Sequence, residues 1–423
     1  MSWPVRYKMV GFLTAGSMIN YADRVNISVA APVMMAALGW NERDFGLIFS
    51  AFLCGYMLLQ FPGGIIADRW NTRWVLGWSC IGFSVLTALT PAGAIAFGLM
   101  LAIRFGVGLF ESVSFPAYAV MNSRWIPRLE FGRAQTASMS GSHLGQALAY
   151  PLTTWIVLTF NWPAVFYFNA IVGIVWAMAW LAYSANTPAE HPGVTENERR
   201  TIEEQLAPRP TGHISPWQLL TDRRVLWLSV AYLLIVYGLW MIILWTPTYL
   251  VKARGYSMQA MGFLGMIPTM AGFAGLIIGG AISDVLLRRG YSVRFARVRA
   301  PAFCVVLGVP AIVAAAYVPS ATVSVGCLAA YMFLANLGGG ACWSIPIELN
   351  PREIGAISGV MNAAGNFAGI FGPLTAGFLV ATTGSWTLPF LAIAVTLLVG
   401  VLVLYFLVVP DPIEVQPVTG RGD

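Results

Sequence analysis

Apolar and polar residues alternate along this chain in long blocks. Each apolar block holds about 20 or more residues, which is the length of helix that crosses the hydrocarbon core of a bilayer. The pattern predicts an all-α membrane protein with twelve transmembrane helices, at roughly residues 9–36, 44–67, 74–92, 94–121, 133–160, 163–184, 224–250, 258–286, 300–318, 321–347, 354–382 and 386–409. Only 10% of the residues are charged, against about 25% in soluble domains.

The longest polar segment divides the chain into two halves. Residues 186–223 are rich in Glu, Arg and Pro; they separate a six-helix half (1–185) from a second one (224–410), which ends in a polar tail (411–423). The halves echo each other, because Gly-Gly-Ile-Ile-Ala-Asp at 63–68 matches Gly-Gly-Ala-Ile-Ser-Asp at 279–284. Parallel six-helix repeats with a binding site between them are a known transporter architecture.

The basic residues gather on one side of the predicted membrane. If the N-terminus is inside, 19 of the 24 Lys and Arg residues fall on the cytoplasmic side. This asymmetry is the positive-inside rule, so both termini and the connector are predicted to be cytoplasmic. The net charge of +6 therefore reflects topology, and we expect no nucleic-acid partner.

No motif for soluble-enzyme chemistry interrupts the pattern. The sequence has no nucleotide-binding P-loop, metal-ligand cluster or nucleophile motif, so an ATP-driven pump and a membrane enzyme have little support. The five cysteines fall within predicted spans, at spacings that suggest neither a metal nor a disulfide. We expect no enzyme activity, no metal and no cofactor.

Four charges lie inside predicted spans. Arg104 and Glu111 are seven residues apart, so on a helix they lie within roughly 20° of each other and share a face. Asp23 and Arg24 are adjacent and project about 100° apart, so one should face a cavity and the other a neighbouring helix. Charges at the centre of a bilayer are costly and are functional by default; the alternative is two structural ion pairs.

The loop after the second predicted helix carries a recognisable motif. Gly-Gly-Ile-Ile-Ala-Asp-Arg-Trp-Asn-Thr-Arg at 63–73 resembles the signature loop of the major facilitator superfamily, with Asn71 where glycine is usual. The resemblance covers the whole chain and implies that Gly64 lets helices approach closely. It also implies a charge cluster between the halves that changes partners as they rock, or else simple snorkelling charges. The residues expected to gate the halves are Gly64, Asp68, Arg69, Arg73 and Asp284.

Three motifs surround the intramembrane charges. They are Tyr-x-Asp-Arg at 21–24, Arg-x-x-x-Gly-x-x-Glu at 104–111 followed by Pro116, and Tyr56 within Phe-Ser-Ala-Phe-Leu-Cys-Gly-Tyr at 49–56. The polar stretch 186–198 and Met-Asn-Ala-Ala-Gly-Asn at 361–366 add to them. Together they resemble the anion:cation symporter family, whose carriers move organic anions with protons.

This resemblance implies roles for individual residues. Arg24 and Arg104 would take the substrate carboxylate, while Asp23 and Glu111 would exchange protons. The residues implied to line the pocket are Tyr21, Tyr56 and Asn362.

Five further polar or aromatic residues are candidates for the substrate site. Asn366 follows Asn362 by four residues, so the two amides share a helix face and suit substrate hydroxyl groups. A lone intramembrane histidine is more often packed and hydrogen-bonded than functional, and a tryptophan needs no role beyond packing. The candidates are Ser142, His143, Gln146, Trp343 and Asn366.

The features combine into one expectation of function. We expect a proton-coupled symporter that imports a small organic anion by alternating access, most consistent with a sugar acid such as an aldonate, aldarate or hexuronate. The alternatives are a carrier of a small aromatic or dicarboxylic acid, and an anion receptor that does not transport. We expect a monomer surrounded by lipid in the inner membrane.

Overall fold

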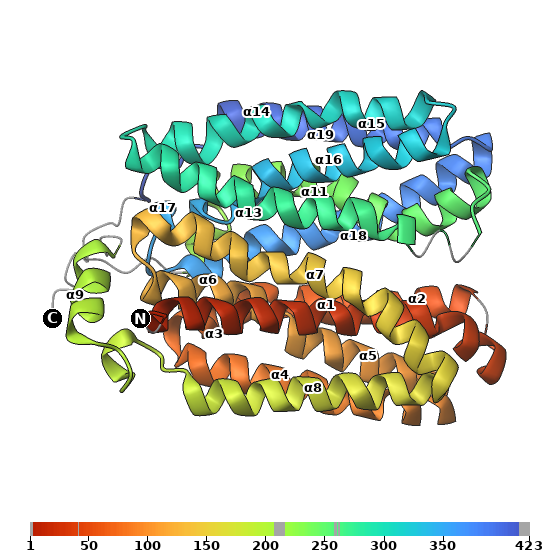
Figure 1. Cartoon of the computed structure of the whole chain (residues 1–423), viewed down its shortest axis with the longest axis horizontal. Coiled ribbons are helices and arrows are strands. Elements are labelled where there is room, and N and C mark those ends of the chain that lie inside the picture. The colour runs from red at the N-terminus through yellow and green to blue at the C-terminus, as the bar shows by residue number, and fades with distance from the viewer. Residues whose placement is uncertain (1–2, 41, 207–215, 258–259, 261–262, 414–423) are drawn as a thin grey trace, which may run out of the picture.

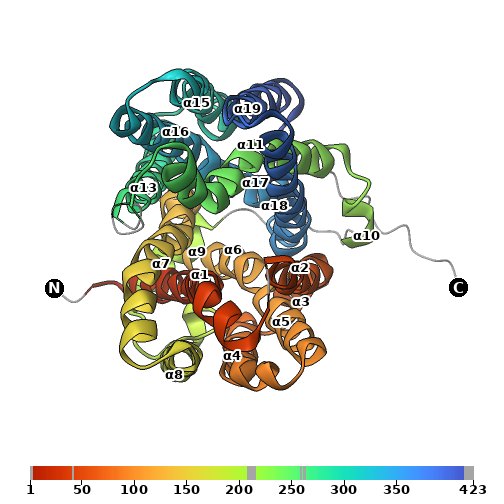
Figure 2. The same ribbon diagram turned by 90° about the vertical axis from the view of Figure 1, so that its right-hand side faces the viewer.

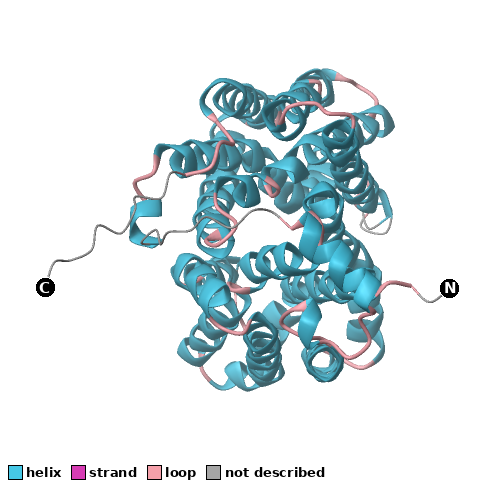
Figure 3. Cartoon of the chain, turned by 90° about the vertical axis from the view of Figure 1, so that its left-hand side faces the viewer, coloured by secondary structure: helices cyan, strands magenta, loops and turns pink. Residues whose placement is uncertain are grey.

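The computed structural model describes residues 3–40, 42–206, 216–257, 260 and 263–413. The regular elements of these residues are helices joined by short loops (Figures 1 and 3). The N-terminal half contains α1 (Val5–Leu38), α2 (Glu42–Leu58), α3 (Gln60–Arg69), α4 (Thr72–Leu89), α5 (Phe97–Glu111), α6 (Ser114–Trp125), α7 (Phe131–Thr159) and α8 (Trp162–Tyr183).

The described regular elements of the connector and of the C-terminal half are also helices. The connector contributes α9 (Glu196–Gln205) and α10 (Pro216–Leu219). The second half contains α11 (Arg223–Thr248), α13 (Met266–Arg288), the π-helix η5 (Phe295–Arg299), α14 (Ala300–Val306), α15 (Gly308–Tyr317), α16 (Ala321–Cys342), α17 (Ile345–Leu349), α18 (Ile354–Thr383) and α19 (Thr387–Leu407).

Twelve spans emerge from these helices, as the apolar blocks predict. Within the described residues, nine helical spans are long and apolar enough to cross a membrane by themselves. A tenth consists of α2 and α3, which meet at a bend of 41°. Pro62 explains this break, because it has no N–H for the carbonyl of Leu58 and its ring collides with that carbonyl. The remaining two, α1 and α7, have 34 and 29 residues but are more polar, because they carry candidate site residues.

The two halves pack as structural repeats. In the first half the main helix pairs are α1 with α7, α2 with α5, and α4 with α8. In the second half the corresponding pairs are α11 with α18, α13 with α16, and α15 with α19. Figure 2 shows the red-to-yellow half and the green-to-blue half as two separate bundles that face each other. This arrangement confirms the pseudo-symmetric fold expected from the sequence repeat.

One end of the bundle carries the connector helix. There α9 lies beside the start of α1 (Figure 1), and Glu198 of α9 accepts hydrogen bonds from the backbone N–H groups of Val5 and Arg6, at 3.2 and 3.0 Å. A carboxylate stabilises the unpaired N–H groups at a helix N-terminus. The start of the connector is therefore fixed to the N-terminal half. We call this end of the molecule the connector end.

Candidate functional site

Two crossed ion pairs join α1 to α5. The Arg24 Nε atom lies 2.9 Å from Glu111 Oε2, and Arg104 Nη1 lies 3.8 Å from Asp23 Oδ2. Arg104 and Glu111 do share a face of α5, as their spacing predicts. Asp23 and Arg24 diverge as adjacent helical residues must, since Asp23 Oδ1 also accepts a bond of 3.0 Å from Thr87 on the neighbouring helix α4.

The glycine of the Arg-x-x-x-Gly-x-x-Glu motif brings α2 against this pair of helices. A Cβ atom at Gly108 would lie 2.1 Å from the backbone oxygen of Phe52 and 2.8 Å from the nitrogen of Tyr56. Such a contact is impossible for any side chain, so glycine at this position permits the close approach of α2 and α5. The approach places Phe52 and Tyr56 beside the arginines.

Aromatic rings enclose the two guanidinium groups. The Arg24 guanidinium carbon lies 4.2 Å from the ring centroid of Tyr56, 4.7 Å from that of Tyr21 and 5.3 Å from that of Phe52. The guanidinium carbon of Arg104 lies 5.1 Å from the ring centroid of Phe52. Cation–π contacts of this kind stabilise a desolvated cation by about 2 kcal/mol. Phe52 was not among the predicted site residues, although it lies within the quoted Tyr56 segment.

Several polar atoms of the four charges have no hydrogen-bond partner in the described structure. The donors are Arg24 Nη2 and the Nε and Nη1 atoms of Arg104, and the acceptors are Glu111 Oε1 and Asp23 Oδ2. All five atoms are buried. Buried polar atoms are nearly always paired, so unpaired ones call for an explanation. Unused guanidinium donors in a buried site suit a carboxylate, which binds arginine through two parallel hydrogen bonds.

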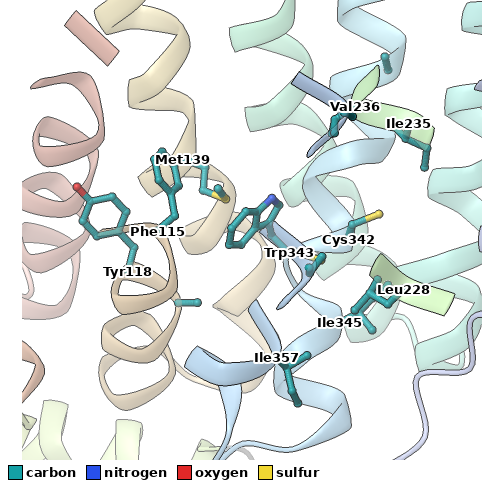
Figure 4. Packing of buried hydrophobic residues seen from close by; sticks show 14 of the residues in the cluster. Phe115, Tyr118, Met139, Leu228, Ile235, Val236, Cys342, Trp343, Ile345 and Ile357 are labelled. Atoms are coloured by element: carbon teal, nitrogen blue, oxygen red, sulfur yellow. The ribbon is translucent and has the colours of Figure 1, made fainter. Parts of the chain in front are cut away.

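Trp343 connects this region to the C-terminal half. Its ring lies 6.1 Å from Phe115, which in turn lies 5.9 Å from Tyr21 (ring centroids). On its other side the Trp343 Nε1–H donates a 3.0 Å hydrogen bond to the hydroxyl of Tyr232 on α11. Figure 4 shows Phe115 and Met139 facing the Trp343 ring across the boundary between the halves. Phe115 and Tyr232 were not predicted, and no sequence signal distinguishes Tyr232 from other aromatic residues in apolar helices.

The two asparagines of α18 lie on one face, as predicted. The Asn366 Nδ2 group donates to the backbone oxygen of Asn362 at 2.7 Å and to its side-chain oxygen at 3.3 Å. The Asn362 Nδ2 group is buried and has no partner among the described residues. A Cβ at Gly359, one turn before Asn362, would lie 2.6 Å from the Gln60 oxygen. Asn362 is therefore approximately level with Tyr56, one turn before Gln60.

The candidates on α7 lie at a contact between the halves. The Ser142 hydroxyl donates to the Met139 carbonyl at 2.7 Å and lies 3.2 Å from His143 Nδ1. A Cβ at Gly272 would lie 3.2 Å from His143 Nε2 and 3.0 Å from Asn336 Nδ2. His143 thus packs between α13 and α16 of the opposite half. Gln146 is buried one turn further along and makes no hydrogen bond within the described part of the chain.

Asp68 closes the connector end by capping a helix of the other half. Its two oxygens accept hydrogen bonds of 2.8 Å each from the backbone N–H groups of Gly355 and Ala356, at the start of α18. A Cβ at Gly64 would lie 2.1 Å from the Gly355 oxygen. The close approach of helices that the motif implies at Gly64 is therefore present, between α3 and α18.

Asp284 makes the pseudo-symmetric contact. It accepts bonds from the backbone N–H groups of Gly132 and Arg133, at 3.1 and 2.7 Å, at the start of α7. Arg297 binds Asp284 at 3.1 Å and lies 3.7 Å from Glu348. Both repeats thus use an aspartate to hold a helix N-terminus of the opposite half.

The other two basic residues of the signature loop lie elsewhere. Arg69 is exposed at the end of α3 and makes no ion pair among the described residues, and Arg73 donates within its own half to the carbonyl of Leu181. The loop is instead held by Arg124 of α6, which donates to Asn186 Oδ1 at 2.5 Å and to the backbone oxygen of Asp68 at 3.1 Å. Arg124 was not predicted, because it lies outside the motif.

Glu130 anchors a second charge cluster at the connector end. It binds Arg133 at 2.7 Å and Tyr7 at 2.9 Å within its own half, and Arg288 at 3.3 Å in the other half. Partial burial opposes ionisation of Glu130, but the hydrogen bonds from Arg133 and Tyr7 outweigh it and hold the pKa of this carboxyl below its usual range. The cluster therefore contains a stable carboxylate at neutral pH.

Comparison with known proteins identifies the family. Residues 13–349 match the profile of the Major Facilitator Superfamily. The chain is 33% identical to the probable galactarate/D-glucarate transporter GudP of Bacillus subtilis over 402 residues, which cover 90% of this chain and 87% of that one. It is 32% identical to the probable sulfoacetate transporter SauU of Cupriavidus necator, over a match that covers 95% of this chain and 94% of that one.

A solved structure agrees with this assignment at the level of the fold. The proton:xylose symporter XylE superposes with a TM-score of 0.78 at 14% identity, covering 95% of this chain and 96% of that one. The matched profile, the anion transporters among the relatives and this fold all agree with the sequence motifs. The chain is a multi-pass membrane transporter that belongs to the major facilitator superfamily, within its anion:cation symporter family.

Proposed function

We propose that this protein is a proton-coupled symporter that imports a small organic anion, with sugar acids as the substrate class. The observation that supports the proposal most directly is the pair of crossed ion pairs between α1 and α5, in which guanidinium donors remain unpaired in a buried site. Two structural ion pairs would have no need of unused donors, since leaving them buried is costly.

Coupling follows from competition for Arg24. In the structure Arg24 Nε lies 2.9 Å from Glu111 Oε2, and the Glu111 side chain is fully buried. A substrate carboxylate that binds the Arg24 guanidinium would therefore take away the charged partner of Glu111. A buried carboxylate without a charged partner is costly and binds a proton instead. Substrate and proton then travel in the same carrier state. Asp23 Oδ2 has no hydrogen-bond partner among the described residues and lies 3.8 Å from Arg104 Nη1, so we assign Asp23 the second proton site.

The connector end forms the closed gate in this proposal. We place it, with both termini, on the cytoplasmic side of the inner membrane, because the basic residues concentrate there. The contacts of Asp68 and Asp284 then belong to a state closed toward the cytoplasm. Rocking of the halves would break both contacts and expose the site to the inside.

Two features favour a hydroxylated acid as substrate. The unpaired amide of Asn362 lies at about the level of Tyr56 along the helices, and amides suit hydroxyl groups. The name of the relative from B. subtilis refers to galactarate and D-glucarate, which are sugar diacids. The second candidate is a small dianion without hydroxyl groups, which the sulfoacetate transporter among the relatives favours.

Uptake into proteoliposomes tests the proposal. The purified protein would be given D-glucarate, galactonate, glucuronate, sulfoacetate or benzoate under an inward proton gradient without ATP. We expect at least one sugar acid to accumulate inside the vesicles, and we expect a protonophore, which dissipates the proton gradient, to abolish this accumulation. Binding without flux for every acid would indicate a receptor instead, and preference for sulfoacetate or benzoate would replace the sugar-acid assignment.

A further inference from the structure

A run of arginines near the end of α13 has few acidic neighbours. Residues 285–347 contain no Asp or Glu, yet five arginines fall between 288 and 299. Arg288 pairs with Glu130, and Arg297 pairs with Asp284. The other three have no carboxylate partner within the described residues: Arg289, Arg294 and Arg299.

Two of these arginines converge on the last turn of α19. The Arg294 Nη2 group donates to the backbone oxygen of Phe406 at 3.5 Å, and the Arg299 guanidinium carbon lies 5.6 Å from the ring centroid of Tyr405. The Arg294 Nε group is buried and has no partner among the described residues. Two cations held against the adjacent residues Tyr405 and Phe406 repel each other, and the helix C-terminus supplies only a partial negative charge.

Exposed aromatic side chains lie on the same segments as the two arginines and at the end of α19. The rings of Tyr291 and Phe295 stack at 5.1 Å, and both are exposed. Phe406 and Phe303 are exposed by 63% and 65%. In a multi-pass membrane protein, exposed aromatic residues near helix ends face lipid at the membrane interface. The cation pair therefore lies where a lipid headgroup meets its acyl chains, outside the substrate site.

We propose that Arg294 and Arg299 bind the phosphate diester of an anionic phospholipid, whose acyl chains lie along Phe303 and Phe406. Arginine suits this ligand because its planar donors grip phosphate oxygens in pairs. A phospholipid also explains the apolar surroundings, which a free phosphate ion would not require. Arg289, which is exposed directly after the end of α13, adds a further positive charge to this segment. Basic clusters between helix ends on the cytoplasmic side are typical sites for such headgroups.

Native mass spectrometry of the full chain in detergent tests this proposal, with phosphatidylglycerol and phosphatidylcholine titrated separately. We expect one phosphatidylglycerol to bind in preference to phosphatidylcholine, and the double variant R294Q/R299Q to bind it about 30-fold more weakly. The matched control is R199Q/R200Q on α9, which removes two exposed arginines whose partners are glutamates; it should bind phosphatidylglycerol as the unmodified chain does.

Other outcomes contradict the proposal. Equal loss in R294Q/R299Q and in the control would show non-specific attraction, and unchanged binding in R294Q/R299Q would place the lipid elsewhere. Displacement of phosphatidylglycerol by inorganic phosphate would indicate a free-phosphate site. If R294Q/R299Q does not fold, R294K/R299K keeps both charges without the planar fork and should still weaken binding; full binding by that variant would also refute the site.

Discussion

Replacing Gly64 by alanine should destabilise the closed connector end. A Cβ at this position would lie 2.1 Å from the Gly355 oxygen, so α3 and α18 must separate by about 1.3 Å to reach an ordinary contact distance. The two bonds of Asp68 to Gly355 and Ala356 would then lengthen from 2.8 Å to about 4.1 Å, beyond the range of a hydrogen bond.

The loss can be estimated from these two bonds. Each contributes about 0.5–1.5 kcal/mol, so the closed state loses about 1–3 kcal/mol. Because 1.4 kcal/mol corresponds to a factor of ten, the ratio of closed to open molecules should fall by at least about fivefold.

Thiol labelling measures this ratio. The reporter is Ser358→Cys, on α18 close to its contact with α3, where Ser358 is fully buried. It is introduced into a variant that lacks the five native cysteines. Labelling from the connector end should accelerate strongly with Gly64→Ala. The matched control is Gly326→Ala, where a Cβ meets no atom within 4 Å. Asp68→Asn tests the same bonds without steric strain. Unchanged labelling in both Gly64→Ala and Asp68→Asn would refute the gate.

Three further predictions concern the site and the charge cluster. Arg24→Lys should weaken substrate binding by at least about tenfold in a thermal-shift titration, because lysine lacks the planar pair of donors; unchanged affinity would place the carboxylate elsewhere. Glu111→Gln should exchange substrate across the membrane but not accumulate it against a gradient, and retained accumulation would transfer the coupling role to Asp23. The pKa of Glu130 is lowered in the folded protein. Its carboxylate therefore stabilises the folded state fully at pH values above its ordinary pKa of 4.5, and this stabilisation is lost as the pH falls through the lowered pKa. The difference in melting temperature between the unmodified chain and Glu130→Gln should accordingly shrink on acidification, and a difference independent of pH would contradict this.

The sequence by itself determines the fold class and the chemistry available in the membrane. Hydrophobic blocks predict the transmembrane helices, because insertion of a segment into lipid depends on its local composition. The sequence repeat at 63–68 and 279–284 indicates two similar halves. The spacing of Arg104 and Glu111 fixes their common face, because helical geometry is local. The predictions about these two residues and about the asparagine pair of α18 therefore agree with the structure.

Only the tertiary structure decides which of these groups meet. The crossed pairing of Arg24 with Glu111 and of Arg104 with Asp23 depends on how α1 lies against α5. Arg69 and Arg73 belong to the same motif as Asp68, yet of these three only Asp68 makes a hydrogen bond to the opposite half within the described residues. Tyr232 reaches the site because α11 packs where the Tyr232 hydroxyl can accept the hydrogen bond from Trp343. Such contacts join segments distant in sequence, and packing between helices, rather than any local pattern, selects them.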